Sequence, residues 1–268
     1  MAAEPTPPTG TRAPTTIPVT VVIAARNEAA NVQGCIDSVR WAGEIIVADH
    51  GSVDDTIARA RSAAATVLDG RDAATIGLLR NAAIETARNE WVLVVDADER
   101  GTPALGAELA RTTAASALGV PTAEAYRLPR RNFFLGAEIR HGGWDRDRPV
   151  RLFRRSVRYD ESRVHEHVVT SGAVGLVREP LLHYPYQSLD AYFEKFERYS
   201  RWWAEDQWHR GRRASAWAVV SKPPARFFGM YVLRGGMRDG ARGTVLAALA
   251  AASVLAKYAR LWAMRFAS

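Results

Sequence analysis

The sequence predicts an α/β protein in which a mostly parallel, Rossmann-like sheet is flanked by helices and followed by a helical, basic C-terminal region. Two patterns support this expectation. Short β-branched runs alternate with helical stretches over the first hundred residues, as in the βαβ units that build a parallel sheet. Residues 187–268 then hold 14 Lys or Arg and 6 Asp or Glu, a net charge of +8, whereas residues 1–186 hold 22 and 23.

The alternation of strands and helices begins after a proline-rich start. The run VTVVIA is typical of a strand that is buried on both faces. A serine and two aspartates open one of the helices as a cap. In chain order, we expect strand 19–24, helix 27–39, strand 44–49, helix 52–64, helix 75–89 and strand 91–95.

Three polar clusters follow predicted strands, at residues 25–28 (ARNE), 49–56 (DHGSVDDT) and 96–99 (DADE). Because ligands of such sheets bind beyond the carboxyl ends of the strands, we expect these clusters to share one site. No G-x-G-x-x-G follows the first strand and no G-x-x-x-x-G-K-[ST] is present, which argues against a dinucleotide dehydrogenase and a P-loop NTPase. The pattern favours a nucleoside diphosphate that carries a group to be transferred.

The third cluster places three carboxylates within four positions. Asp96, Asp98 and Glu99 repel one another unless a positive charge lies between them. A divalent cation, which prefers carboxylate oxygens, is the usual one. Asp98 is therefore the candidate metal ligand.

The other two clusters supply candidate contacts to the rest of the donor. Asp49 is placed to accept a hydrogen bond from a base or a ribose. Arg26 and Arg80 carry the positive charge that a diphosphate requires.

The segments VVIAARNEAANVQGCIDSV, EIIVADHGSVDDT and RNAAIETARNEWVLVVDADE together resemble the family-2 inverting glycosyltransferases of the GT-A fold. The resemblance continues through RLFRRSVRYDESRVHEHV and LLHYPY. The blocks RHGGWDRDRPVRLFRR and KPPARFFGMYVLRGGMRDGARG are similar to the bacterial lipopolysaccharide-core glucosyltransferase group of that family. His50 departs from the family, which more often has a small polar residue there, and this leaves the base and sugar preference open.

The resemblance implies a sugar transfer from a nucleotide-sugar donor such as UDP-glucose, with Mn²⁺ or Mg²⁺ as the cofactor. It implies that Asp96 faces the ribose and sugar of the donor and that Asp98 ligates the cation. His183 in LLHYPY is the candidate for a further metal ligand. The residues expected to bind the donor are Ala24, Arg26, Glu28, Asp49, Arg80 and Asp96.

An inverting transfer requires a base that takes a proton from the acceptor hydroxyl. The segment YDESRVHEHV offers Asp160, Glu161 and Glu166. We predict Glu166 as the base, because related enzymes place a VHE segment on the acceptor side, and the other two remain alternatives. If the segment is a strand, His165 and His167 lie on the face opposite Glu166.

Ten arginines lie between residues 127 and 158, with Phe133, Phe134 and Trp144 among them. Arginines with interleaved aromatics are typical of a nucleic-acid surface, but no recognition-helix, RNP or OB-type pattern is present. We expect an anionic glycolipid acceptor, or a sugar diphosphate on a lipid carrier, and no nucleic acid. Trp144, stacking on a sugar, and His165 are the candidate acceptor-binding residues.

The C-terminal region pairs its charge with bulky apolar groups. Residues 223–243 interleave aromatics with arginines, as in a helix that lies on an anionic lipid surface. Residues 244–256 carry no charge, and thirteen residues are too few to span a bilayer. We therefore expect three segments: a disordered leader (1–16), a catalytic domain (17–186) and a membrane-associating helical region (187–268).

The single cysteine, Cys35, excludes a disulfide framework, and the N-terminus has no apolar signal core. We expect a cytoplasmic protein that is peripheral on the inner face of the cell membrane. The alternative is a non-catalytic glycosyltransferase-like scaffold that binds lipid or nucleic acid. A scaffold has no need to keep Asp49, Asp98 and Glu166 together, so the enzyme is favoured.

Overall fold

The computed structural model describes residues 16–266 except 121, 161, 163–165 and 187. It divides into two compact units, each of which is described by itself. The first unit holds the described residues of Met1–Ala97, Gly101–Arg127 and Val150–Val177, and the second unit holds those of Asp98–Arg100, Leu128–Pro149 and Arg178–Ser268. The division thus crosses the chain between Ala97 and Asp98, inside the carboxylate cluster.

The first unit is built on a seven-stranded sheet with the order β12-β6-β9-β4-β1-β2-β3. Strands β4, β1, β2 and β3 are parallel, whereas β9 runs antiparallel to both β4 and β6. The bounds are β1 Ile17–Ala25, β2 Ala42–Asp49, β3 Thr66–Asp69, β4 Trp91–Asp96, β6 Ala125–Arg127, β9 Val150–Arg154 and β12 Val174–Leu176. The expected fold class, a mostly parallel sheet flanked by helices, is confirmed.

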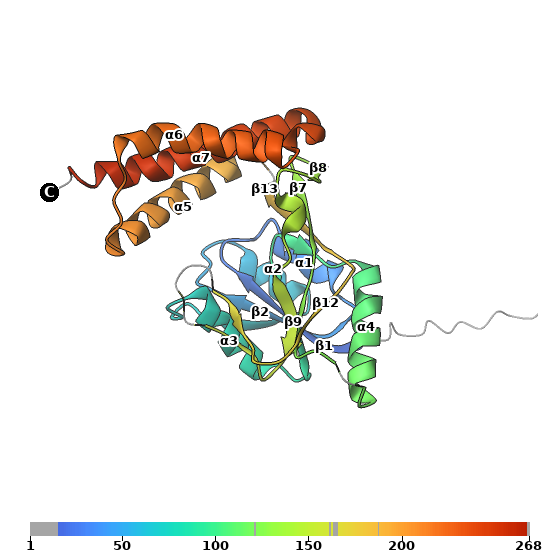
Figure 1. Cartoon of the computed structure of the whole chain (residues 1–268). Helices are drawn as coiled ribbons and strands as arrows, with labels where there is room; N and C mark the ends of the chain where they lie inside the picture. Colours follow the sequence, from blue (N-terminus) through green and yellow to red (C-terminus); the bar gives the residue numbers. More distant parts are fainter. Residues whose placement is uncertain (1–15, 121, 161, 163–165, 187, 267–268) are drawn as a thin grey trace, which may run out of the picture. The chain divides into compact units, whose positions relative to one another are not determined.

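Helices cover both faces of this sheet (Figure 1). The bounds are α1 Val32–Ser38, α2 Thr56–Ser62, α3 Ile76–Thr86 and α4 Pro103–Ala117. Side chains of a strand alternate between its two faces, and both Val21 and Val22 in β1 are fully buried. The continuous β-branched run in the sequence reflects this burial on both sides.

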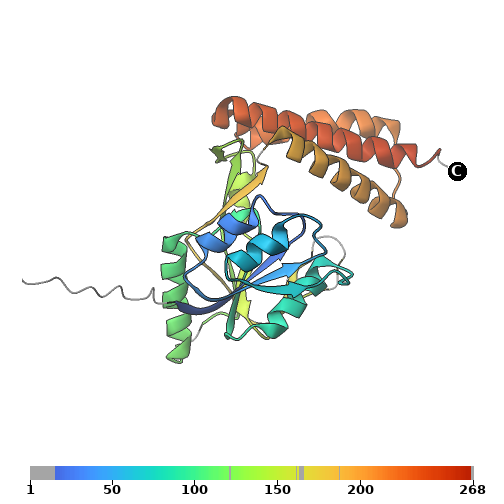
Figure 2. The ribbon, with the colours of Figure 1, turned by 180° about the vertical axis from the view of Figure 1, so that it is seen from behind.

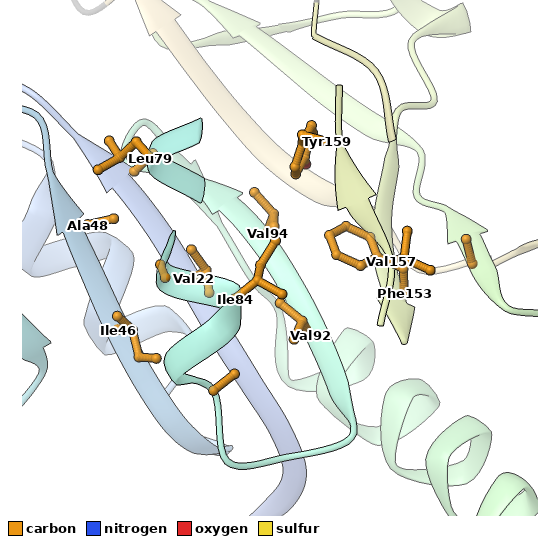
Figure 3. Packing of buried hydrophobic residues seen from close by; sticks show 14 residues of the cluster. Val22, Ile46, Ala48, Leu79, Ile84, Val92, Val94, Phe153, Val157 and Tyr159 are labelled. Atoms are coloured by element: carbon orange, nitrogen blue, oxygen red, sulfur yellow. The ribbon is translucent and has the colours of Figure 1, made fainter. Parts of the chain in front are cut away.

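One face of the sheet packs against α3 (Figure 3). Leu79 and Ile84 of α3 belong to one buried cluster with Val22 and Val94 of the neighbouring strands β1 and β4. Tyr159, from the short hairpin of β10 (Arg158–Tyr159) and β11 (Val168–Val169), closes this cluster at one end. The cluster holds α3 against this face of the sheet.

The second unit combines a small sheet with a set of helices. Its four-stranded sheet has the order β5-β13-β7-β8, with β5 Glu99–Arg100, β7 Arg130–Phe134, β8 Ala137–Ile139 and β13 Leu181–Tyr186. The helices are η1 Trp144–Arg146, α5 Leu189–His209, α6 Ala216–Phe228, η2 Gly229–Leu233, η3 Gly236–Asp239 and α7 Gly240–Ala263. Helix α7 packs against both α5 and α6, and the three lie side by side in Figure 1 and Figure 2.

The uncharged run 244–256 is part of a longer helix than the sequence suggested. Helix α7 has 24 residues, about 36 Å at 1.5 Å per residue. By length and composition the stretch Gly236–Ala263, which contains this run, is sufficient to cross a bilayer, with a mean hydropathy of 1.4 over an 18-residue window, so the thirteen-residue run understates the apolar length. One such helix is weak evidence for a membrane span, since the core helix of a soluble protein meets the same criteria.

Two local expectations also differ from the structure. The helix expected at 27–39 begins only at Val32, because Asn27 takes a left-handed conformation (φ 54°) and its neighbours form a loop. Residues 66–69, to which the sequence analysis assigned no element, form β3, the edge strand of the sheet.

Candidate active site

The register of the sheet brings two of the predicted clusters together in the first unit. Ala24 at the end of β1 is paired with Asp96 at the end of β4, and Ala25 is paired with Asp49 at the end of β2. The carboxylates of Asp49 and Asp96 therefore flank the end of one central strand, as expected for parallel strands that end at the same edge.

The loops after β1 and β2 are joined by side-chain hydrogen bonds. The backbone N–H of Asn27 donates to Ser52 Oγ at 2.9 Å, and the N–H of Val53 donates to Asn27 Oδ1 at 2.9 Å. The N–H of Glu28 donates to Thr56 Oγ1 at 2.8 Å. These bonds fix the two loops that border the sheet edge, so the polar groups there are preorganised.

Asp49 is the most buried carboxylate of this edge, with 2% of the residue exposed. Its Oδ2 accepts from the N–H groups of Gly51 (3.0 Å) and Ser52 (2.9 Å). Its Oδ1 is buried and has no hydrogen-bond partner among the described residues. A buried acceptor without a donor is costly, and it is suited to a hydrogen-bond donor that a ligand brings.

Arg80 of α3 gathers two carboxylates around one buried guanidinium. Its side chain is 8% exposed, Nη2 lies 2.6 Å from Asp96 Oδ1, and Nη1 donates to Glu166. Arg151 of β9 donates to the other oxygen of Asp96. Asp96 is thus held between two arginines, and Glu166 is joined to it through Arg80.

Burial also affects the groups around this arginine. Burial is the largest influence and disfavours the charged form of Arg80, but the charges of Asp96, Tyr159 and Glu166 together outweigh it, and the pKa of Arg80 lies above its ordinary value. The Arg80 guanidinium lies over the Tyr159 ring, 5.2 Å from its centroid. Burial raises the pKa of the Tyr159 hydroxyl above its ordinary value. The cluster therefore keeps a cationic arginine beside a neutral phenol.

The second unit contains Asp98 together with His183 of β13. Asp98 Oδ1 lies 3.6 Å from His183 Nε2, and Asp98 Oδ2 lies 3.4 Å from Lys195 Nζ of α5. The Asp98 carbonyl accepts from the Tyr184 N–H at 2.9 Å, an interaction next to the β5–β13 pairing. The strand pairing thus sets the separation of Asp98 and His183.

Asn132 of β7 determines which nitrogen of His183 carries the proton. The Asn132 amide donates to the Trp144 carbonyl at 2.7 Å, so its oxygen faces His183 Nδ1, 2.6 Å away. His183 must then donate from Nδ1, and in its neutral form Nε2 presents a lone pair towards Asp98. A metal-ligating histidine characteristically has its second nitrogen held in this way.

The Asp98–His183 pair fits a divalent cation. Two acceptors that face each other repel unless a proton or a cation lies between them, and the carboxylate of Asp98 is a ligand type that suits Mn²⁺ and Mg²⁺. Within the described residues no group of three His, Cys, Asp or Glu side chains converges. A cation held by these two residues would need water and substrate phosphates as its other ligands, as Mg²⁺ commonly does.

A pocket of about 420 Å³ opens beside this pair in the second unit. It is lined by Asn132, His183, Tyr186 and Trp144, among other residues. Trp144 sits on the short helix η1, directly after Gly143, whose φ of 93° requires a glycine. The predicted acceptor residue Trp144 and the predicted metal residue His183 thus both line this pocket.

The remaining predicted residues are placed as follows. Arg26 is exposed on the loop after β1, and Glu28 is half-buried and accepts from Asn31 at 2.7 Å. Glu166 and His167 precede β11 and are not in a strand. The condition under which His167 would lie on the strand face opposite Glu166 is therefore not met. Residues His165 and Glu161 lie outside the described part of the chain.

Four residues that the structure brings into these clusters were not predicted from the sequence: Arg151, Tyr159, Asn132 and Lys195. Arg151 was one of the ten arginines, and nothing in the sequence separated it from the others. Asn132 lies in the strand RRNFF, where a buried amide has no distinguishing spacing.

Residues 20–158 match Glycosyl transferase family 2. The chain is 31% identical, over 91% of its length and 94% of the relative's, to the lipopolysaccharide core biosynthesis glycosyltransferase LpsC of Rhizobium meliloti. It is 26% identical to an uncharacterized glycosyltransferase of Rickettsia felis, over 81% of this chain and 79% of that one.

A solved structure of glucosyl-3-phosphoglycerate synthase from Mycobacterium tuberculosis with Mn²⁺ and UDP is 23% identical. The match covers 42% of this chain and 44% of that one, with a TM-score of 0.35. The family match spans more than half of the chain, and the similarity to LpsC spans nearly all of it. The chain therefore belongs to glycosyl transferase family 2 and is a glycosyltransferase.

Proposed function

We propose that this glycosyltransferase transfers a sugar from a nucleoside-diphosphate donor, such as UDP-glucose, to a lipid-linked or lipopolysaccharide-type glycan. The transfer inverts the configuration at the anomeric carbon of the sugar. We propose that it works as a peripheral protein on the cytoplasmic face of the membrane. The observation that supports a diphosphate donor best is the pair Asp98–His183, in which two acceptors face each other at 3.6 Å. Such a pair suits the cation that accompanies a sugar diphosphate.

The roles of the chain's own residues in donor binding follow from their surroundings. The free Oδ1 of Asp49 accepts from the base or ribose, and Asp96 accepts from the ribose and sugar. Exposed Arg26 contacts the diphosphate. Both Nη atoms of Arg80 donate to carboxylates, so this arginine positions Asp96 and Glu166. A divalent cation on Asp98 and His183 supplies Lewis-acid stabilisation of the charge on the leaving diphosphate.

Glu166 is our candidate for the base. It is half-buried, and Arg80 pairs with both Glu166 and Asp96, the carboxylate proposed to bind the donor. Asp160 is a weaker candidate. Its carboxylate accepts from the backbone N–H groups of His167 (3.1 Å) and Ser162 (3.3 Å). These bonds lower the pKa of Asp160, which makes it a poorer proton acceptor.

The membrane role is supported by the outer face of α6. Trp217, Val220 and Phe228 are spaced by three and eight residues, so they share one helical face, and their exposed fractions are 77%, 67% and 54%. Aromatic and aliphatic groups beside basic ones are typical of a helix that enters the lipid interface. The similarity to LpsC supports an acceptor of the lipopolysaccharide class.

The test is a donor screen with the purified chain. UDP-, GDP- and dTDP-sugars are offered with Mn²⁺, Mg²⁺ or EDTA, and release of the nucleoside diphosphate and transfer to lipopolysaccharide core acceptors are measured. We expect one donor to be used, only with a metal. Asp98→Asn should lose about a hundredfold or more in kcat/KM, whereas Asp190→Asn, at an exposed site in the same unit, should not.

Two results would contradict the proposal. Transfer at the same rate in EDTA would show that the reaction does not require a cation. Full activity of Asp98→Asn would remove the role of this residue.

A further inference from the structure

The second unit contains another pocket, open to solvent and lined mostly by residues of α5, α6 and α7, with a volume of about 430 Å³. Its walls are of two kinds. Met230, Leu246 and Val254 form an aliphatic side, whereas Arg226 and Lys257 supply two positive charges. A pocket of this kind is suited to a molecule that is apolar along its length and anionic at one point.

The two cations of this pocket have no acidic partner among the described residues. Neither Arg226 nor Lys257 takes part in an ion pair there, and Lys257 Nζ lies over the Trp203 ring, 5.9 Å from its centroid. Burial and then the charge of Arg226 lower the pKa of Lys257. The other titratable groups of the lining are tyrosines, Tyr192 and Tyr258 among them. Two like charges are thus held close together without a counter-charge, an arrangement that an anion stabilises.

Arg226 is directed away from the proposed membrane face of α6. It lies two residues before Phe228 and nine after Trp217. At 100° per residue these separations place Arg226 about 160–200° around the helix from both. The same helix therefore presents an apolar stripe outwards and a cation to the pocket.

We propose that this pocket binds the phosphate group of a lipid, with the adjoining alkyl chain on Met230, Leu246 and Val254. A phosphate provides enough oxygens to accept hydrogen bonds from both cations. The aliphatic side of the pocket is suited to an apolar chain attached to that phosphate. The pocket shares Trp144 and Tyr186 with the pocket beside His183. On the basis of the proposed function, we assign the pocket to the phosphorylated lipid part of the acceptor.

The experiment measures lipid binding directly and without any sugar donor, so it is independent of whether transfer occurs. Dihexanoyl phosphatidic acid is titrated into the full chain by calorimetry below its micellar concentration. Dihexanoylglycerol, which lacks the phosphate, and inorganic phosphate are titrated separately. We expect the phosphatidic acid to bind at least tenfold more tightly than either.

Three variants localise the binding. Arg226→Gln and Lys257→Gln should each weaken it about tenfold, the loss of a charge-assisted hydrogen bond. Lys222→Gln removes the same charge from an exposed position of α6 that does not line the pocket and should bind as the unchanged chain does. Ser253→Phe fills the pocket without changing its charge and should also abolish binding. Circular dichroism verifies that each variant is folded.

Several results would overturn the assignment. Equal affinity for dihexanoylglycerol would show that the cations do not contribute. Equal affinity for inorganic phosphate would show a simple anion site. Equal weakening by Lys222→Gln would show nonspecific attraction to the basic surface, and tight binding by a folded Ser253→Phe would place the lipid elsewhere.

Discussion

Replacing Arg80 with methionine tests whether this buried guanidinium holds the carboxylates of the first unit in place. The change keeps an unbranched, largely apolar side chain of somewhat shorter length and removes the guanidinium and its charge. Side-chain exposure is 8% for Arg80, 16% for Glu166 and 29% for Asp96, so the lost partner leaves Glu166 as a largely buried carboxylate without its cation. Removing one member of a buried pair costs about 3–5 kcal/mol.

The low end of that range applies here, because Asp96 keeps Arg151 and is partly exposed. A loss of about 3 kcal/mol lowers the Tm of a domain of this size by about 6–12 °C. The assay is thermal unfolding followed by circular dichroism. Arg88→Met is the matched control, since Arg88 is 78% exposed and pairs with Glu44, and such a pair contributes about 1 kcal/mol or less.

A double-mutant cycle identifies the cause of the loss. Adding Glu166→Gln to Arg80→Met removes the uncompensated charge, so the double variant should recover about 1–2 kcal/mol relative to the sum of the single variants. If Arg80→Met unfolds at the temperature of the unchanged chain, or if the two single effects add, the assigned role of Arg80 is refuted.

Three further predictions concern the base, a surface ion pair and the membrane face. Glu166→Gln should lose transfer by about a hundredfold or more while the affinity for the donor, measured by calorimetry, stays within about twofold; unchanged transfer would exclude Glu166 as the base. Hydrogen bonds from Arg131 lower the pKa of Glu138 from 4.5 to about 2, so this carboxylate stabilises the fold above pH 4.5. Glu138→Gln should therefore lower the free energy of unfolding, measured with urea, by about 1–2 kcal/mol at pH 7. This loss should become smaller as the pH falls towards 2. A loss that stays the same at every pH would contradict the assignment. Trp217→Ser should weaken sedimentation with anionic liposomes severalfold, and equal sedimentation would remove α6 from the membrane contact.

The sequence by itself determined three central parallel strands of the sheet and the polar residues that follow them. The runs at 19–24, 44–49 and 91–95 are short, β-branched and followed by polar groups, and these features depend only on residues that are neighbours in the chain. Because parallel strands end at one edge, the approach of Asp49 to Asp96 followed from the pattern without coordinates. The segment 27–39 was less predictable, since the left-handed Asn27 interrupts a helical composition.

The tertiary structure alone decided which side chains surround these carboxylates. Arg80 and Glu166 are 86 residues apart, His183 and Asn132 are 51 apart, and Lys195 and Asp98 are 97 apart. Each contact requires a specific strand register or helix position, and a shift of one residue turns a strand side chain to the opposite face. The tautomer of His183 depends on the carbonyl of Trp144 through Asn132, and no local spacing encodes such a chain of hydrogen bonds. The residues proposed to conduct the chemistry can thus be named from the sequence, whereas the groups that hold them in place are determined by packing between distant segments.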